Sequence, residues 1–474
     1  METWIKRIFE EEKKKRGLPL EVKTIQGKPY LYKSTTHWDK TEKKRKKDSV
    51  YLARITQEGV IEKTERVRRI RSIFEYGNAK LLTILADDIL PSLKKFFPDD
   101  YNEIVAMSII KLIHQAPIKS MKSRWEKLYL STESDAALSP NTLSEKLRRI
   151  GSDWVSQKRF FDTLLTDSKV LLFDMSSIFS YSEDLRLAEK GHNADHLYLK
   201  QVNFVLFFSQ DKKIPVFMKS LPGSVRDIKS LKNVMGEVSL GDDTILVMNR
   251  GFASYSLADL FAEKKLKFVQ PLRRNFKIID YDTPFQKSFL YRGRGINWGK
   301  KSVNGKVLYL FEDVKMRAEE ETTFISLIVQ GKRKRSRLDE ERKKFGRIAI
   351  LSNIKDDGEK IYLLYKQREE VEVAFDAMKN EMENDKTYLS DDDAVRGYFF
   401  VSFISLYLYY RILEVLRRND LIGKTSVNDL LFELSKIYQV YHEDGKRRLS
   451  EIPAKAEEFD RLFGFDLFPK ALRS

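Results

Sequence analysis

The chain has 474 residues, more than one hydrophobic core usually holds, so two to four domains are expected. Lys and Arg number 87 against 70 Asp and Glu, and the net charge of +17 favours a polyanionic partner, either nucleic acid or an acidic membrane face. The absence of cysteine excludes disulfides and thiolate metal sites.

Residues 1–75 are predicted to form a basic N-terminal DNA-binding segment, since they hold 21 Lys and Arg against 12 Asp and Glu. A charged helix is expected over Trp4–Arg16, where no apolar run suggests a signal peptide. The basic runs Lys43–Lys47 and Arg66–Arg71 are as typical of a solvated face as of DNA contact. Their place among β-prone and aromatic residues favours binding to the phosphate backbone.

Residues 76–164 are predicted to form a helical DNA-binding domain, because apolar residues recur there at spacings of three and four. The segment Ser139–Glu145 has the composition of a helix N-terminus. The helix that it begins could be half of a helix-turn-helix or a plain packing helix.

An α/β pattern starts at residue 165, and the core is predicted to run over 165–275 and 346–420. A β-rich insertion is expected over 276–345, and a helical C-terminal region used for dimerisation over 421–474. The apolar run Gly397–Tyr410 has 14 residues, too few to cross a bilayer, and is interpreted as a buried helix. The expected strands are Val170–Phe173, Val202–Phe208, Pro215–Met218, Thr244–Met248, Lys267–Gln270, Phe289–Arg292, Val307–Phe311, Thr323–Val329 and Arg347–Ser352.

Three polar residues follow buried elements of this core. Asp174 and Asn249 each come directly after an apolar strand, and Glu372 lies on the helix predicted over Gln367–Asn384. Taken singly, each is more typical of a cap or a surface residue. Brought together, three oxygen ligands suit a hard cation such as Mg2+ or Mn2+. We therefore interpret Asp174, Asn249 and Glu372 as candidate catalytic residues and metal ligands.

The helix that carries Glu372 has a further pattern, Y-x2-R-x3-E-x6-K, formed by Tyr365, Arg368, Glu372 and Lys379. Offsets of 3, 7 and 14 would keep all four residues on one face of a continuous helix. Arg368 and Lys379 would then grip phosphates on either side of the metal ligand. An ordinary salt-bridged helix would also show such charge pairs.

This pattern resembles the signature of the DDE transposases of insertion sequences, a group with a β insertion before the glutamate. The resemblance covers about residues 165–415. It is carried, besides the signature, by Leu172–Ser177, Leu221–Asp227, Val247–Phe252, Leu351–Asn353 and Ala394–Tyr398.

The resemblance implies an α/β fold with an RNase H-like mixed-sheet core, interrupted by a β-rich insertion. It implies a cytoplasmic, nucleoid-associated prokaryotic protein, without a membrane partner, that forms a homodimer in a synaptic complex with double-stranded DNA, both transposon ends and target. Two Mg2+ or Mn2+ ions would serve strand cleavage and transfer. Arg250, Tyr365, Arg368 and Lys379 would position the DNA, and Trp298 would stack on an extruded base.

The sequence departs from the family pattern at Asn249, where the family has its second aspartate. An amide brings no negative charge, so metal binding and chemistry should both weaken. Asp242 and Asp243 lie about 16 Å away along the strand and cannot substitute. Three explanations of Asn249 remain open: a decayed or repurposed transposase, a deliberate inactivating change, and an active enzyme that tolerates Asn.

These explanations give three functional hypotheses: a transposase, here in an inactivated form; a catalytically inactive transposase-derived DNA-binding protein; and a structure-specific nuclease.

His192 and His196 have the spacing of a zinc pair, but they lie in a polar segment without a third ligand in view and are interpreted as loop residues.

Overall fold

The computed structural model describes residues 2–39, 44–62, 69–191, 199–225, 227–381, 386–387 and 389–473. His192, His196 and part of both N-terminal basic runs lie outside these ranges. The chain divides into two compact units. The first comprises Met1–Arg71 with His442–Lys446, and the second comprises Ser72–Tyr441 with Arg447–Ser474.

The first unit packs helix α1 (Thr3–Arg16) against an antiparallel sheet in the order β1-β2-β3-β4. Helix α1 ends at Gly17, whose left-handed φ of 63° lets the chain turn into the sheet. The strands are β1 (Leu20–Ile25), β2 (Lys28–Asp39), β3 (Lys44–Thr56) and β4 (Gly59–Glu62). Its small separate core is formed by Ile5, Ile8, Leu31, Ala53 and Ile55.

The second unit is built around a mixed sheet whose central strands run in the order β9-β8-β6-β10-β11. Strand β8 is antiparallel to β6 and β9, whereas β10 is parallel to both β6 and β11. This order and direction are those of an RNase H-like core, as the sequence predicted. The strands are β6 (Val170–Ser180), β8 (Lys200–Ser209), β9 (Ile214–Pro222), β10 (Ile245–Met248) and β11 (Lys267–Pro271).

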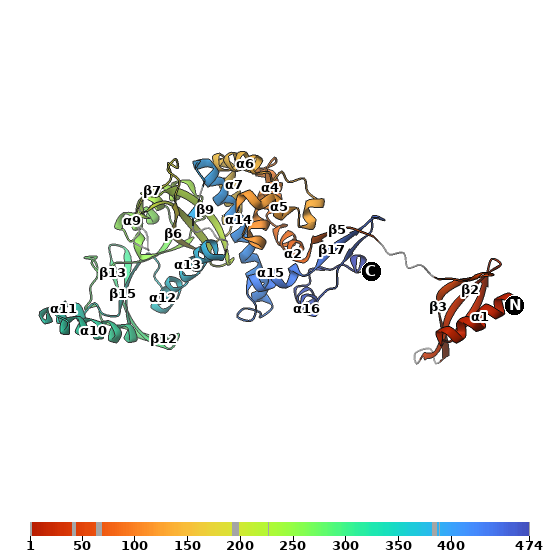
Figure 1. Ribbon diagram of the computed structural model, residues 1–474. Helices are drawn as coiled ribbons and strands as arrows, with labels where there is room; N and C mark the ends of the chain where they lie inside the picture. The colour runs from red at the N-terminus through yellow and green to blue at the C-terminus, as the bar shows by residue number, and fades with distance from the viewer. Residues whose placement is uncertain are drawn as a thin grey trace. The chain divides into compact units, whose positions relative to one another are not determined.

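Beyond β11 the same sheet continues with β15, the strand that follows the predicted insertion, and then with the insertion strands in the order β14-β13-β12. They are β12 (Lys287–Tyr291), β13 (Arg294–Val303), β14 (Lys306–Asp313) and β15 (Arg347–Ser352). Together with helices α10 (Val314–Val329) and α11 (Leu338–Arg342) they form one end of the second unit (Figure 1).

The strand predicted over Thr323–Val329 is wrong, because these residues belong to helix α10. Asp313 begins that helix by accepting a 2.9 Å hydrogen bond from the Met316 N–H. Once begun, a helix gains one backbone hydrogen bond with each added residue. No residue of α10 is buried, so no neighbouring strand competes for the β-prone run.

The predicted helical domain 76–164 does not form a unit of its own. Its helices share one core with the sheet, and α6 (Pro140–Ser152) and α4 (Tyr101–His114) both pack on α14 (Asp392–Arg418) (Figure 1). Helix α6 begins at the predicted cap, Ser139, and buries Leu143, Leu147 and Ile150, so it is a packing helix.

Helix α14 contains the apolar run predicted to be buried. It is long and apolar enough to cross a membrane by length and composition, but 78% of its most apolar window is buried inside the protein. The prediction of a buried helix is therefore confirmed.

The predicted helical C-terminal region is partly a β structure. Helices α15 (Val427–Ser435) and α16 (Ala454–Phe463) flank a hairpin of β17 (Tyr438–His442) and β18 (Arg447–Leu449). The hairpin belongs to a three-stranded sheet in the order β18-β17-β5, where β5 is Ile70–Glu75.

Candidate active site

Asp174 and Asn249 come together because two parallel strands carry them to the same level of the sheet. Phe173 of β6 lies opposite Met248 of β10, so the next residue of each strand projects at the same level. The Asn249 side-chain Nδ2 donates a 3.3 Å hydrogen bond to Asp174 Oδ2. The sequence placed Asp174 after its strand, but β6 continues to Ser180, because β8 pairs with it along this whole stretch.

The Asp174 carboxyl is only 8% exposed, and this burial raises its pKa to about 7. Hydrogen bonds from the Met175 N–H, at 2.8 Å, and from Asn249 favour the ionised form and act against the rise. The negative charge of Glu372 adds to the rise of this pKa. A buried carboxyl next to another acid is the environment in which a bound cation is favoured.

Asn249 directs its amide oxygen away from Asp174. The residue caps a short 3-10 helix, Arg250–Phe252, and its Oδ1 accepts a 2.7 Å hydrogen bond from the Arg250 N–H. The group that faces Asp174 is therefore an N–H donor and not an oxygen ligand. Asp243 lies at the other end of β10, where it pairs with Lys267 at 3.0 Å, and does not replace the missing acid.

Glu372 lies on helix α13 (Glu369–Asp376), and its half-exposed carboxylate is held by an ion pair with Arg368. The guanidinium of Arg368 lies 5.2 Å from the centre of the Tyr365 ring. Tyr365 is only 4% exposed, so its predicted direct contact with DNA is wrong in this conformation. The Tyr365 ring lies against Arg368, which forms the ion pair with Glu372.

The signature does not lie on one regular helix. Tyr365 belongs to α12 (Gly358–Lys366), which ends two residues before α13 begins. Lys379 lies in a π-helical turn, Ala377–Glu381. The wider turn changes the angular position of Lys379 somewhat relative to a regular 3.6-residue period. Short π segments of this kind are frequent at functional sites.

Two further residues predicted to contact DNA differ in exposure. Arg250 is exposed beside Asn249, where a phosphate can reach it. Trp298 is only 3% exposed and packs so closely on Gly358 that a Cβ there would come within 2.2 Å of its ring. The prediction that Trp298 stacks on an extruded base is therefore wrong in this conformation, because its ring belongs to the core between β13 and α12.

Sequence reasoning missed several buried polar side chains that hold the loops around the site. Asn203 Nδ2 donates to the backbone oxygens of Gly223 and Val225, at 3.0 and 3.1 Å, and so shapes the turn after β9. Gln270 Nε2 donates to the oxygens of Phe252 and Ser254 and fixes the segment after Asn249. A polar residue inside an apolar strand is the signal that could have found both.

The side chains present offer two carboxylates and one amide to a divalent cation. Within the ranges described above, no group of three His, Asp or Glu side chains is placed to hold a metal ion. Buried Asp174 and half-exposed Glu372 still provide carboxylate oxygens of the kind that a single hard cation favours. The donor set therefore fits one cation and lacks the charge expected for a pair.

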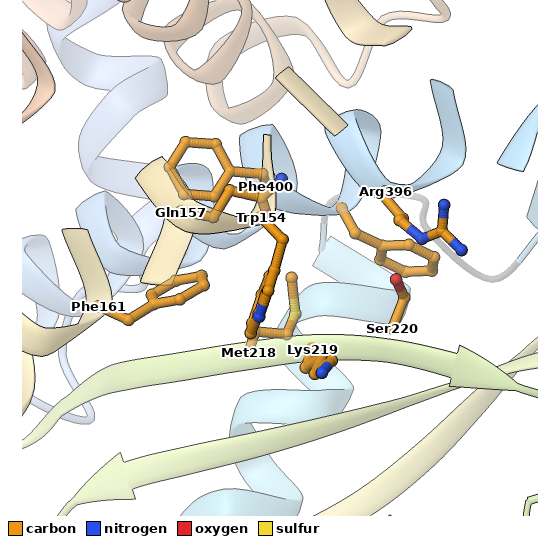
Figure 2. Close-up of a pocket in the computed structure, with 9 residues that line it drawn as sticks. Trp154, Gln157, Phe161, Met218, Lys219, Ser220, Arg396 and Phe400 are labelled. Atoms are coloured by element: carbon orange, nitrogen blue, oxygen red, sulfur yellow. The ribbon is translucent and has the colours of Figure 1, made fainter. Parts of the chain in front are cut away.

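A pocket lies between α7 (Trp154–Leu165), β9 and α14, and neither Asp174 nor Glu372 is among its lining residues. Trp154, Phe161 and Phe400 surround it, and Arg396 and Ser220 close one side (Figure 2). Its volume is about 70 Å3.

Comparison with known proteins identifies the family of this chain. A family model described as "Transposase DDE domain" matches residues 165–408, a segment that contains Asp174, Asn249 and Glu372. No curated protein sequence matches the chain. Among solved structures, the chain is similar to a piggyBac transposase in a synaptic complex with hairpin DNA, studied by cryo-EM. The two are 11% identical over 86% of this chain and 82% of that one, with a TM-score of 0.42. Because the family model matches more than half of the sequence, the chain belongs to the family of transposases with a DDE domain.

Proposed function

We propose that this transposase binds the terminal inverted repeats of its element as a homodimer, and that Asn249 has disabled strand cleavage. The observation that carries the proposal is the orientation of the Asn249 amide. It donates its N–H to Asp174 and turns its oxygen to the Arg250 backbone, so it offers neither charge nor an oxygen to a cation.

Asp174 and Glu372 would hold the divalent cation, Mg2+ or Mn2+. When bound at such a site, these ions activate water or a 3′-hydroxyl and stabilise the leaving oxygen. Around them, Arg368 holds Glu372 in place, and exposed Arg250 is positioned to bind a DNA phosphate. Loss of one carboxylate charge from this site should cost several kcal/mol of transition-state stabilisation.

Cleavage of the element's own ends tests this proposal. The wild-type chain and Asn249→Asp would be incubated with duplexes that carry the inverted repeats flanking the gene, in Mg2+ or Mn2+. We expect the wild type to bind without cutting and Asn249→Asp to cut. Asn249→Asp combined with Glu372→Gln is the matched control, and it should not cut. Cleavage by the wild type would overturn the proposed inactivation.

The alternative is a transposase-derived protein that acts through DNA binding alone, as a repressor or an architectural protein. The same amide orientation favours it, because Asn249 satisfies Asp174 without a metal. It predicts tight, salt-sensitive binding to the ends and no cleavage by either version. Binding by Asn249→Asp without cleavage would therefore favour this alternative.

A further inference from the structure

The hairpin of β2 and β3 in the first unit extends beyond the strands on either side. Strand β1 pairs with β2 only over residues 28–33, and β4 pairs with β3 only over 53–56. Six further residue pairs, from Ser34 with Ser49 to Asp39 with Lys44, continue the hairpin as two strands alone. We call this segment, Ser34–Asp39 with Lys44–Ser49, the ribbon. At about 3.4 Å per residue it is about 20 Å long.

The two faces of the ribbon differ in chemistry. One face of the ribbon continues the side of the sheet that lies opposite α1, and we call it the outer face. Among the ribbon residues, the outer face has no acidic side chain. The other face carries Asp48, which lies 3.1 Å from the His37 ring nitrogen Nδ1. The outer face is formed by Ser34, Thr36, Trp38, Arg45, Lys47 and Ser49.

Aromatic residues continue the outer face down the sheet. The Tyr51 ring meets Tyr30 and Tyr32 edge to face, at centroid distances of 5.8 and 5.6 Å. Because these rings pack on each other, they stiffen the base of the ribbon. Trp38, near the far end, is 58% exposed. Glu21, at the foot of this face, is paired with Lys47 at 2.7 Å.

We propose that the ribbon enters the major groove of duplex DNA and presents its outer face to the bases. This rests on the proposed function, in which the chain binds duplex ends. The major groove is about 12 Å wide and admits a two-stranded β-ribbon. Arg45 donates to guanine acceptors, and the Trp38 ring offers apolar contact to thymine methyl groups.

A duplex fits these observations better than single-stranded nucleic acid. Single strands are bound by successive stacking on open aromatic faces. Here the three tyrosines pack on one another, whereas the ribbon beyond them is narrow, cationic and rich in hydroxyl groups. Hydroxyl side chains and arginine suit hydrogen bonding to base edges and phosphates.

The test compares neighbouring residues on opposite faces. In the full chain, Arg45→Ala and Lys46→Ala each remove one positive charge from the same strand, so a general electrostatic effect is equal in both. Binding would be measured by fluorescence anisotropy on a duplex that the wild-type chain selects from a random-sequence pool. We expect Arg45→Ala to weaken binding about tenfold or more and Lys46→Ala by at most about threefold. Trp38→Ala and His37→Ala form a second matched pair.

Chemical probes on the DNA identify the groove. Replacing guanine by 7-deazaguanine removes a major-groove acceptor, and it should weaken the wild type but leave Arg45→Ala little changed. Equal losses for Arg45→Ala and Lys46→Ala, or displacement by a minor-groove drug without a 7-deazaguanine effect, would overturn the ribbon proposal. Tighter binding to the single strand than to the duplex would also overturn it. All three results leave the cleavage test of Asn249→Asp standing, so the two proposals fail separately.

Discussion

At the scale of single residues, the contact between Asn249 and Asp174 defines this molecule most clearly. Two facing carboxylates repel unless a cation lies between them. The Asn249 amide supplies an N–H donor to Asp174 instead, at 3.3 Å. Asn249 therefore satisfies the Asp174 carboxylate in the absence of a cation.

Asn249→Asp should make stability depend on metal. In EDTA, we expect the free energy of unfolding to fall by about 1–3 kcal/mol, since a buried hydrogen bond is lost and a second charge is added. Added Mg2+ should restore most of this loss, because it binds the folded state. The measurement is thermal unfolding with and without Mg2+. Asn249→Ala adds no charge and is the control, so its thermal stability should not change with Mg2+. If Asn249→Asp were as stable as the wild type in EDTA, the prediction would be contradicted.

His114 should make stability depend on pH. Burial lowers the pKa of His114, and the charge of Glu75, whose Oε2 lies 3.9 Å from the ring Nε2, acts against that shift. The unfolded chain takes up a proton near pH 6.5, but the folded chain does so only at lower pH. The contribution of His114 to the free energy of unfolding is therefore fully present above pH 6.5. It decreases as the pH falls below 6.5, by at most about 1.4 kcal/mol per pH unit.

Chemical denaturation between neutral and mildly acidic pH measures this dependence. His114→Gln should reduce the loss of stability on acidification, and exposed His37→Gln is the control. Identical slopes for the wild type and His114→Gln would show that another group is responsible.

At the scale of elements, helices α6 and α14 approach so closely that each needs a glycine at the contact. A Cβ on Gly397 would lie 2.0 Å from the Leu147 oxygen, and one on Gly151 would lie 1.7 Å from the Asp393 oxygen. Since these neighbours are backbone atoms, the helices must separate to accept a methyl group. This contact joins the helical region to the helix that follows the catalytic segment.

Gly397→Ala should therefore destabilise the second unit by about 2–4 kcal/mol, because overpacking moves the backbone. Gly236→Ala is the matched control: Gly236 lies in helix α8 (Asp227–Glu237), and nothing lies within 4 Å of a Cβ there. It should be neutral or stabilise by about 1 kcal/mol, as expected for Ala against Gly in a helix. Urea denaturation compares the two, and equal effects would contradict the close helix contact.

The elements also show what can be predicted from sequence and what cannot. Apolar runs located the central strands, because a strand buried on both faces needs continuous apolar residues. They did not predict that β6 extends to Ser180, since its polar second half is held by pairing with β8. The helix break before Arg368 and the π turn at Lys379 likewise depend on packing that no local period reveals.

The candidate site likewise has features that the sequence predicts and features that depend on the fold. Asp174, Asn249 and Glu372 were predicted because an apolar run ends just before each of the first two and a spaced motif contains the third. The burial of Trp298 and Tyr365 was missed, because exposure is decided by residues distant in the chain. Gly358, which receives the Trp298 ring, follows it by 60 positions in the sequence.

At the scale of the whole molecule, the chain has two hydrophobic cores that share no residues. The small core of the first unit contains Leu31 and Ala53, and the large core joins buried residues from the sheet and the helices of the second unit. A unit with its own core can unfold without the rest. The first unit can therefore change its stability while the unit with the transposase domain keeps its fold.

This separation predicts how single core substitutions act. Leu31 is fully buried in the small core, and Leu31→Ala should destabilise the first unit by about 2–5 kcal/mol. Hydrogen exchange followed by mass spectrometry should show faster exchange over residues 2–62 and no change over the second unit. Leu406→Ala, at a fully buried position of α14, should give the reverse pattern. If either substitution accelerates exchange in both units, they unfold as one cooperative structure, and loss of the first unit would then cost the transposase domain its fold as well.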